Sequence, residues 1–222
     1  MPVVDLLGWL AAALSAALSL PQLIRLIRAG TSAGLSLLLW QCLMAAGFGW
    51  TVHGLVVGRP NMWLPNLAMA LCAIAILRLI ARDRGYGLVQ TWALPLGLFA
   101  TLVTIDAVWG SVAYGVATSV PQVLGAAAQL VDIIRSVDIT GVSPFYVTMA
   151  VVVQGIWLWW GLLAHEQAVI VSASANGSVA LLTWLWYLAR RLGVPAMVFA
   201  RPLGEGAGGH DVARAGAAKD AV

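Results

Sequence analysis

The chain has 222 residues, a formal net charge of +3 and a mass of 23.3 kDa. Hydrophobic residues make up 61% and charged residues only 9% of it, and the mean hydropathy is +0.91. Ordinary soluble domains carry about 25% charged residues, which they need to cover their surface. The composition therefore excludes a soluble enzyme, a nucleic-acid-binding domain, a disulfide scaffold and a disordered chain, and it predicts an all-α membrane protein.

Seven stretches of the chain are apolar enough to cross a bilayer, which takes about 20 helical residues at about 1.5 Å each. The weakest break between them is at Asp106, between the fourth and fifth stretches. No Asp, Glu, Lys or Arg lies in the middle of any predicted span, which favours an uncharged substrate and argues against ion coupling. The spans are 6–28, 34–57, 62–80, 88–104, 107–130, 143–164 and 167–189.

Arginine and lysine predict the orientation of these spans. If the N-terminus lies outside, every basic residue except Arg59 falls on the inner side, as the positive-inside rule requires. Asp5, Asp106 and Glu166 then fall on the outer side. The Gly- and Ala-rich segment 193–222 is predicted to be a disordered cytoplasmic tail. The excess of Arg over Lys indicates a GC-rich bacterial genome, and hence the bacterial plasma membrane.

An internal repeat divides the predicted spans into two sets. Ser19-Leu-Pro-Gln recurs as Ser119-Val-Pro-Gln at an offset of 100, and Trp50 with Gly54 recurs as Trp157 with Gly161 at an offset of 107. Each copy holds three spans, and one further span between them restores the same orientation in the membrane. The sequence thus predicts two parallel triple-helix bundles in a 3+1+3 arrangement: bundle 1–82, linker helix 83–105 and bundle 106–192.

These motifs resemble the PQ-loop repeat family, above all its SWEET and SemiSWEET branch of sugar transporters. The resemblance covers roughly residues 6–190. His53 and Trp160 stand where the family usually has Tyr in Trp-x-x-Tyr-Gly. The resemblance implies passage of mono- or disaccharides across the membrane by alternating access, without coupling to an ion. The family also contains amino-acid carriers, so the fold alone does not fix the substrate.

Two Pro-Gln pairs are the candidate hinges. Proline inside a helix removes one hydrogen bond and clashes with the carbonyl four residues earlier, which weakens the helix by about 3 kcal/mol. A static kink is the alternative, but the symmetric placement favours moving hinges, as the resemblance also implies. The candidate hinge residues are Pro21, Gln22, Pro121 and Gln122.

Four residues are the candidate substrate site. Trp50 and Asn66 lie at similar predicted depths on adjacent spans, and Trp157 repeats Trp50. Asn176 lies three residues beyond the position that repeats Asn66, which we attribute to a longer loop near Glu166. The resemblance implies that the indoles stack on a sugar ring while the amides bond its hydroxyls. The alternative is that both asparagines only pin helices together.

The remaining residues give no sign of catalysis. No nucleophile–base pair, metal cluster or cofactor motif appears, so we expect neither an enzyme nor a bound metal. His53 is read as an interfacial hydrogen-bonding residue, and Ser36 and Ser143 as helix caps. The partners expected are the lipid bilayer and a small neutral solute, with a homo-oligomer left open. Two alternatives remain: a proton-coupled amino-acid carrier using Asp106 or Asp132, and a receptor or assembly factor on the same scaffold.

Overall fold

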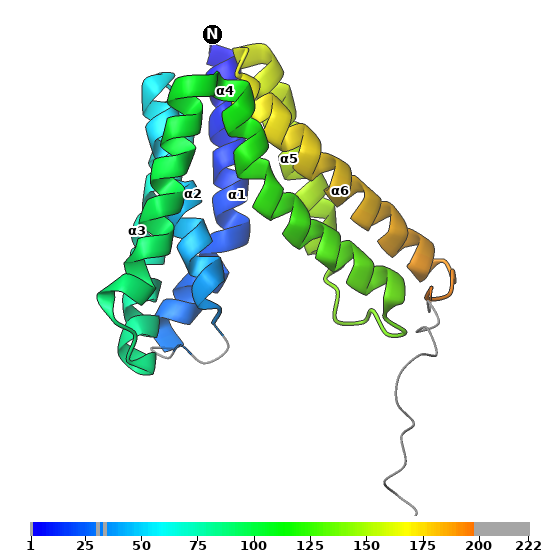
Figure 1. Ribbon diagram of the computed structural model, residues 1–222. Helices are drawn as coiled ribbons and strands as arrows, with labels where there is room; N and C mark the ends of the chain where they lie inside the picture. The colour runs from blue at the N-terminus through cyan, green and yellow to red at the C-terminus, as the bar shows by residue number, and fades with distance from the viewer. Residues whose placement is uncertain (1, 30–31, 33–34, 198–222) are drawn as a thin grey trace, which may run out of the picture.

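The computed structural model describes residues 2–29, 32 and 35–197, and these form helices joined by short connections, without a strand (Figure 1). The predicted tail lies outside the described residues from position 198 onward. Five of the seven predicted spans match single helices to within a few residues, and the other two lie in one helix, α4. The helices are α1 (Pro2–Ala29), α2 (Leu37–Val56), α3 (Pro60–Arg84), α4 (Leu88–Arg135), α5 (Pro144–Ala164) and α6 (Gln167–Arg191).

Several helix ends follow from local sequence. Ser36 and Ser143 are the N-caps of α2 and α5, and each hydroxyl accepts a hydrogen bond from a backbone N–H of the first turn, which confirms their predicted capping role. Proline opens α3 and α5, where a missing N–H costs nothing. Gly85 ends α3 in the left-handed conformation that glycine adopts most easily.

Helix α4 contains a sharp reversal at Gly110, whose φ of 77° and ψ of −178° are not helical. The segment before it (88–109) and the segment after it (111–135) run in opposite directions (Figure 1). The sequence predicted the break between the fourth and fifth spans at Asp106, but the helix continues through this residue. Asp106 lies within the first segment, one turn before Gly110. The reversal thus turns one long apolar helix into a hairpin of two.

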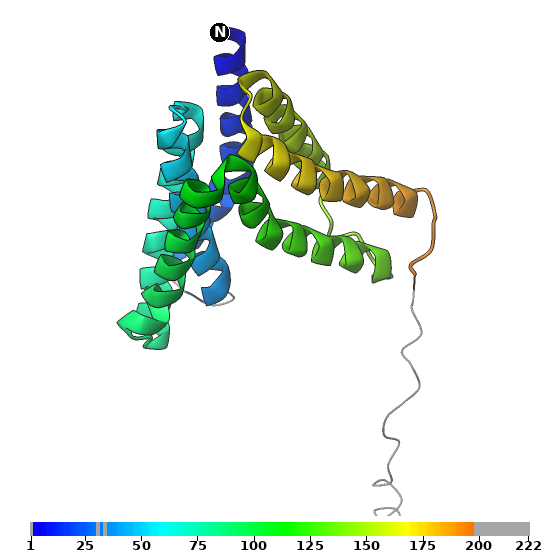
Figure 2. The same cartoon turned by 45° about the horizontal axis from the view of Figure 1, so that its top comes forward.

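Each set of three helices is arranged in the same way. α3 packs against both α1 and α2, and α6 packs against both α4 and α5. The first segment of α4 lies along α2, where Phe48 meets Phe99 edge to face. The helices gather at one end of the molecule, here called the Gly110 end, and spread apart toward the other, here called the Arg190 end (Figure 2).

Paired glycines allow the close packing at the Gly110 end. A Cβ on Gly54 would lie 2.8 Å from the Trp63 backbone nitrogen, and one on Gly161 would lie 3.2 Å from the Ile170 backbone nitrogen. Gly161 and Ile170 stand 107 residues after Gly54 and Trp63. Both repeats therefore bring α2 or α5 against the start of the following helix through the same small residue.

By length and composition, four of the described helices can cross a membrane: α3, α4, α5 and α6. The part of the chain that the structure describes is thus all-helical and of the membrane type.

Candidate substrate cavity

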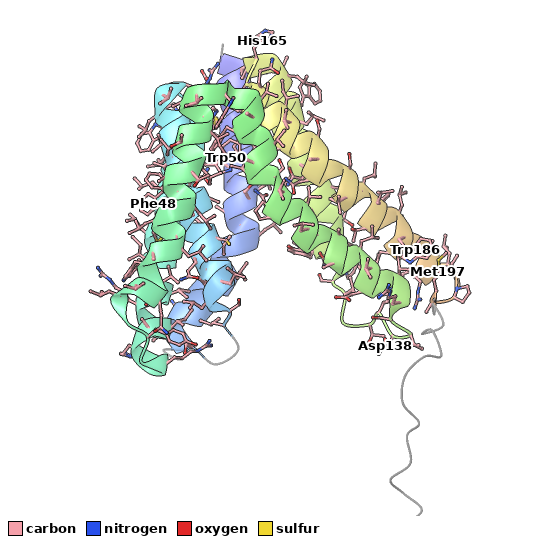
Figure 3. The ribbon with its side chains drawn as sticks, in the orientation of Figure 1. Phe48, Trp50, Asp138, His165, Trp186 and Met197 are labelled. Carbon is pink, nitrogen blue, oxygen red and sulfur yellow. The ribbon has the colours of Figure 1, made fainter. Side chains whose placement is uncertain are left out.

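A cavity of about 400 Å³ lies between the two sets of helices. It is lined by residues of α1, α2 and α3 on one side and of α4, α5 and α6 on the other, and none of these described residues is charged. All four candidate substrate residues, Trp50, Asn66, Trp157 and Asn176, line this one cavity. Trp50 lies toward the Gly110 end (Figure 3).

The two asparagines hold equivalent hydrogen bonds. The Asn66 amide nitrogen donates to the Met62 carbonyl at 2.8 Å, and the Asn176 amide nitrogen donates to the Ser172 carbonyl at 2.9 Å. Each bond runs to the residue four positions earlier and so fixes the side chain along its own helix. An amide has two N–H donors and a carbonyl acceptor. Neither asparagine makes a second hydrogen bond to the described residues, so one N–H and the Oδ1 of each are left for a solute.

The two tryptophans are held differently. The Trp157 indole N–H donates to the Ser15 hydroxyl at 3.0 Å, which ties α5 to α1 across the cavity. Trp157 also packs edge to face on Trp160, with ring centroids 5.5 Å apart, and Trp50 packs in the same way on Tyr114, at 5.1 Å. Edge-to-face packing fixes the ring plane and leaves part of the indole toward the cavity.

The position of Asn176 corrects the expected loop insertion. The α5–α6 connection is His165 and Glu166 alone, which is shorter than the three residues between α2 and α3. Asn176 therefore lies about one helical turn further along α6 than Asn66 lies along α3. The two amides reach the cavity at different depths, so the site is not an exact copy across the repeat.

The Pro-Gln pairs lie inside helices, as predicted, with Pro21 in α1 and Pro121 in α4. Gln122 lines the cavity and its amide nitrogen donates to the Thr118 carbonyl at 3.2 Å, rather than to Ala117, the carbonyl that Pro121 leaves free. The side chains of Pro21 and Gln22 lie outside the described residues. Their proposed hinge motion stays a prediction.

Sequence reasoning missed a buried cluster of ionisable side chains next to the cavity. His53 is 1% exposed; its Nδ1 lies 2.7 Å from Asp106 Oδ2, and its Nε2 lies 3.1 Å from Glu166 Oε1. His53 is therefore not exposed at an interface with water but buried between two carboxylates. One feature of the sequence could have indicated the cluster: His53, Asp106 and Glu166 all lie at the outer ends of predicted spans, and hence at a similar depth in the membrane. The sequence did not indicate that they come together.

Aromatic rings complete this cluster. Tyr114 stacks on the His53 imidazole with centroids 4.8 Å apart and planes at 17°. Trp50 meets the same imidazole edge to face at 5.7 Å. Trp50 is thus shared between the cavity and the cluster.

In the described part of the chain, no group of three or more His, Cys, Asp or Glu side chains is arranged to hold a metal ion.

Part of the chain matches a known family. Residues 3–59 match the PQ loop repeat model. That stretch contains Pro21, Gln22 and Trp50, and it ends at the turn into α3. No curated protein matches the chain.

Proposed function

With a PQ-loop repeat at residues 3–59, the chain belongs to the PQ-loop repeat family, and on that premise we propose that it transports a small neutral sugar, a mono- or disaccharide, across a membrane without ion coupling. The observation that carries this proposal is the convergence of two Trp-plus-Asn pairs on one uncharged cavity. A volume of about 400 Å³ falls in the usual range for small-molecule sites.

The lining chemistry supports a polyhydroxylated neutral solute. A sugar presents an apolar C–H face and a rim of hydroxyls, so it needs a flat aromatic surface and neutral groups that both donate and accept. The indoles of Trp50 and Trp157 supply the flat aromatic surface. The second N–H and the Oδ1 of Asn66 and of Asn176 supply the donors and acceptors. The α-amino and carboxylate groups of an amino acid would find no charged partner in this lining.

The arrangement of helices supports transport by alternating access with seven crossings. The reversal at Gly110 makes α4 a hairpin. If each of its two segments and each of the other five helices crosses the membrane, the chain would make seven passages: three, one linker and three. Pro21 and Pro121 lie in corresponding helices of the two repeats, where they would let each helix bend. Closure at the Gly110 end and divergence at the Arg190 end fit a state open toward the latter (Figure 2).

Uptake into proteoliposomes tests this function. A panel of radiolabelled glucose, sucrose and neutral amino acids is offered to vesicles containing the purified chain. We expect sugar uptake that saturates, and a loss of about tenfold or more in Trp50→Ala and in Asn66→Ala, the equivalent of about 1.4 kcal/mol of binding.

The matched control is Trp159→Ala, which removes the same side chain from α5 two residues after Trp157. Trp159 is 63% exposed and does not line the cavity, so its loss should leave uptake unchanged. Amino-acid uptake in place of sugar uptake would refute the sugar assignment. Unchanged function in both cavity variants would favour a receptor or assembly role instead.

A further inference from the structure

We propose that His53, Asp106 and Glu166 form a proton-binding site that holds the Gly110 end of the cavity closed when the proton is bound. The inference extends the proposed transport function by naming a control on access to the same cavity. In this cluster, one imidazole contacts two carboxylates through its two nitrogens.

Counting hydrogen-bond donors shows why a proton is required. A neutral imidazole has one N–H donor and one lone pair, whereas an ionised carboxylate only accepts. With both carboxylates ionised and His53 neutral, one contact would set a nitrogen lone pair against a carboxylate oxygen. Both contacts become hydrogen bonds only if the cluster gains one proton, either on the imidazole or on one carboxylate. Its charge then changes from −2 to −1.

The surroundings of His53 favour this bound proton. The imidazole is fully buried, and the Asp106 and Glu166 side chains are 15% and 8% exposed, so water screens them poorly. Tyr114 lies face-on to the imidazole, which is the arrangement that favours a cation over an aromatic ring. Two buried, ionised carboxylates without the proton would repel each other across a neutral ring.

Among the described residues, the other charged groups near this end make no ion pair with the cluster. Arg59, the N-cap residue of α3, donates to the Ala164 carbonyl at 3.2 Å and lies over the Trp160 ring. Among the described residues, no ion pair joins Arg59 to Asp106 or Glu166. His165, the C-cap residue of α5, is exposed. The titratable groups that face His53 are Asp106 and Tyr114 of α4 and Glu166, the N-cap residue of α6.

The cluster joins the parts that must separate for the Gly110 end to open. His53 belongs to α2, Asp106 to the first segment of α4, Tyr114 to the second segment and Glu166 to the start of α6. Loss of the proton replaces one attractive contact by a repulsive one at this junction. High pH should therefore open the Gly110 end and low pH should close it. Trp50, which touches His53 and lines the cavity, connects the cluster to the solute.

Two measurements on the full chain in lipid nanodiscs test the proposal without requiring transport. The first is nitrogen NMR of histidine-labelled protein, titrated from about pH 4 to about pH 10. The chain has only three histidines, so the His53 signal is assigned by its absence in His53→Asn. We expect a His53 titration that moves in Glu166→Gln and in Asp106→Asn, whereas His165→Asn, the matched control, leaves it in place.

The second measurement is the distance between spin labels at Val56→Cys of α2 and Leu163→Cys of α5, in a background carrying Cys42→Ala and Cys72→Ala. Both label sites are exposed. The distance should lengthen as the pH rises through the His53 titration, and it should lose this dependence in His53→Asn. The proposal is overturned if the His53 titration is the same in Glu166→Gln and Asp106→Asn as in the parent protein. It is also overturned if the distance between the labels in the parent protein does not change with pH.

These outcomes separate the proton site from the transport function. A pH-dependent distance in a protein that takes up no sugar would uphold the site and refute the sugar transporter. Sugar uptake by a protein in which the distance at the Gly110 end does not change with pH would support the sugar transporter and refute the proton site.

Discussion

Gly110 carries a backbone conformation that other residues resist. Its φ of 77° with ψ of −178° lies in a region that is essentially confined to glycine. A Cβ there would meet nothing within 4 Å, so the restriction is conformational and not one of space. The direction of the whole second half of the chain thus depends on one residue without a side chain.

Replacing Gly110 should therefore destabilise the fold. We expect Gly110→Ala to lower the free energy of unfolding by about 1–3 kcal/mol, measured by thermal or denaturant unfolding in detergent micelles. Gly97→Ala is the control, because Gly97 lies in the same helix, equally open but helical. That substitution should be neutral or stabilise by about 0.5–1 kcal/mol. Equal effects of the two substitutions would contradict this account.

Individual residues also show where sequence reasoning reached its limit. Trp50 and Trp157 were found because they repeat at a fixed offset, and Asn66 and Asn176 because an amide inside an apolar span needs a partner or a cavity. The depth of Asn176 was missed, since an offset between repeats can arise from a longer loop or from a displaced residue, and the sequence does not distinguish them. The His53 cluster was missed because its members come from three distant segments, and only tertiary packing brings them together.

At the scale of helices, the second segment of α4 crosses α6 at a glycine. A Cβ on Gly115 would lie 2.6 Å from the Ala168 carbonyl oxygen and 2.9 Å from the Ala168 Cα. Both are backbone atoms, which cannot swing away as a flexible side chain can. This contact sets how closely the two helices approach beside the His53 cluster.

A methyl group at this crossing should separate the helices. We expect Gly115→Ala to cost about 1–3 kcal/mol of stability, the usual range for overpacking. Gly125→Ala is the control, further along the same segment. A Cβ on Gly125 would meet nothing within 4 Å, so this substitution should not lower the stability. Unfolding midpoints of the two variants, measured side by side, check the difference. A Gly115→Ala protein as stable as its parent would show that the crossing is free to relax.

Helix ends were more predictable than helix neighbours. Serine caps and helix-opening prolines act within one turn, so a local motif is enough to predict them. The central place of α3 and α6 in their sets depends on which faces meet, and apolar spans look alike on every face. The anchoring of Arg84 to the Ser32 and Leu35 carbonyls, and of Arg190 to those of Ser136 and Val137, was equally hidden. Charge counting saw these arginines only as markers of one membrane side.

For the whole molecule, the hairpin in α4 brings the start of α4 and its end to the same end of the structure (Figure 1). A straight helix of 48 residues would extend about 72 Å, more than twice the hydrocarbon thickness of about 30 Å. Folded at Gly110, each segment has the length of one crossing. The last turns of α3, α4 and α6 lie toward the Arg190 end (Figure 1), and they carry Arg84, Arg135, Arg190 and Arg191. Arg59, by contrast, stands at the start of α3.

This distribution predicts that the Arg190 end faces the cytoplasm. Single cysteines in a background with Cys42→Ala and Cys72→Ala test it, one at Val56→Cys near the Gly110 end and one at Val137→Cys near the Arg190 end. Both positions are exposed, at 76% and 84%. In intact bacteria, a membrane-impermeant maleimide should label the first and reach the second only after the membrane is opened. Labelling of both in intact cells would contradict the hairpin, because the two ends would then share one side. Labelling of the second alone would keep the hairpin and invert the protein, which the cost of moving several arginines across the bilayer argues against.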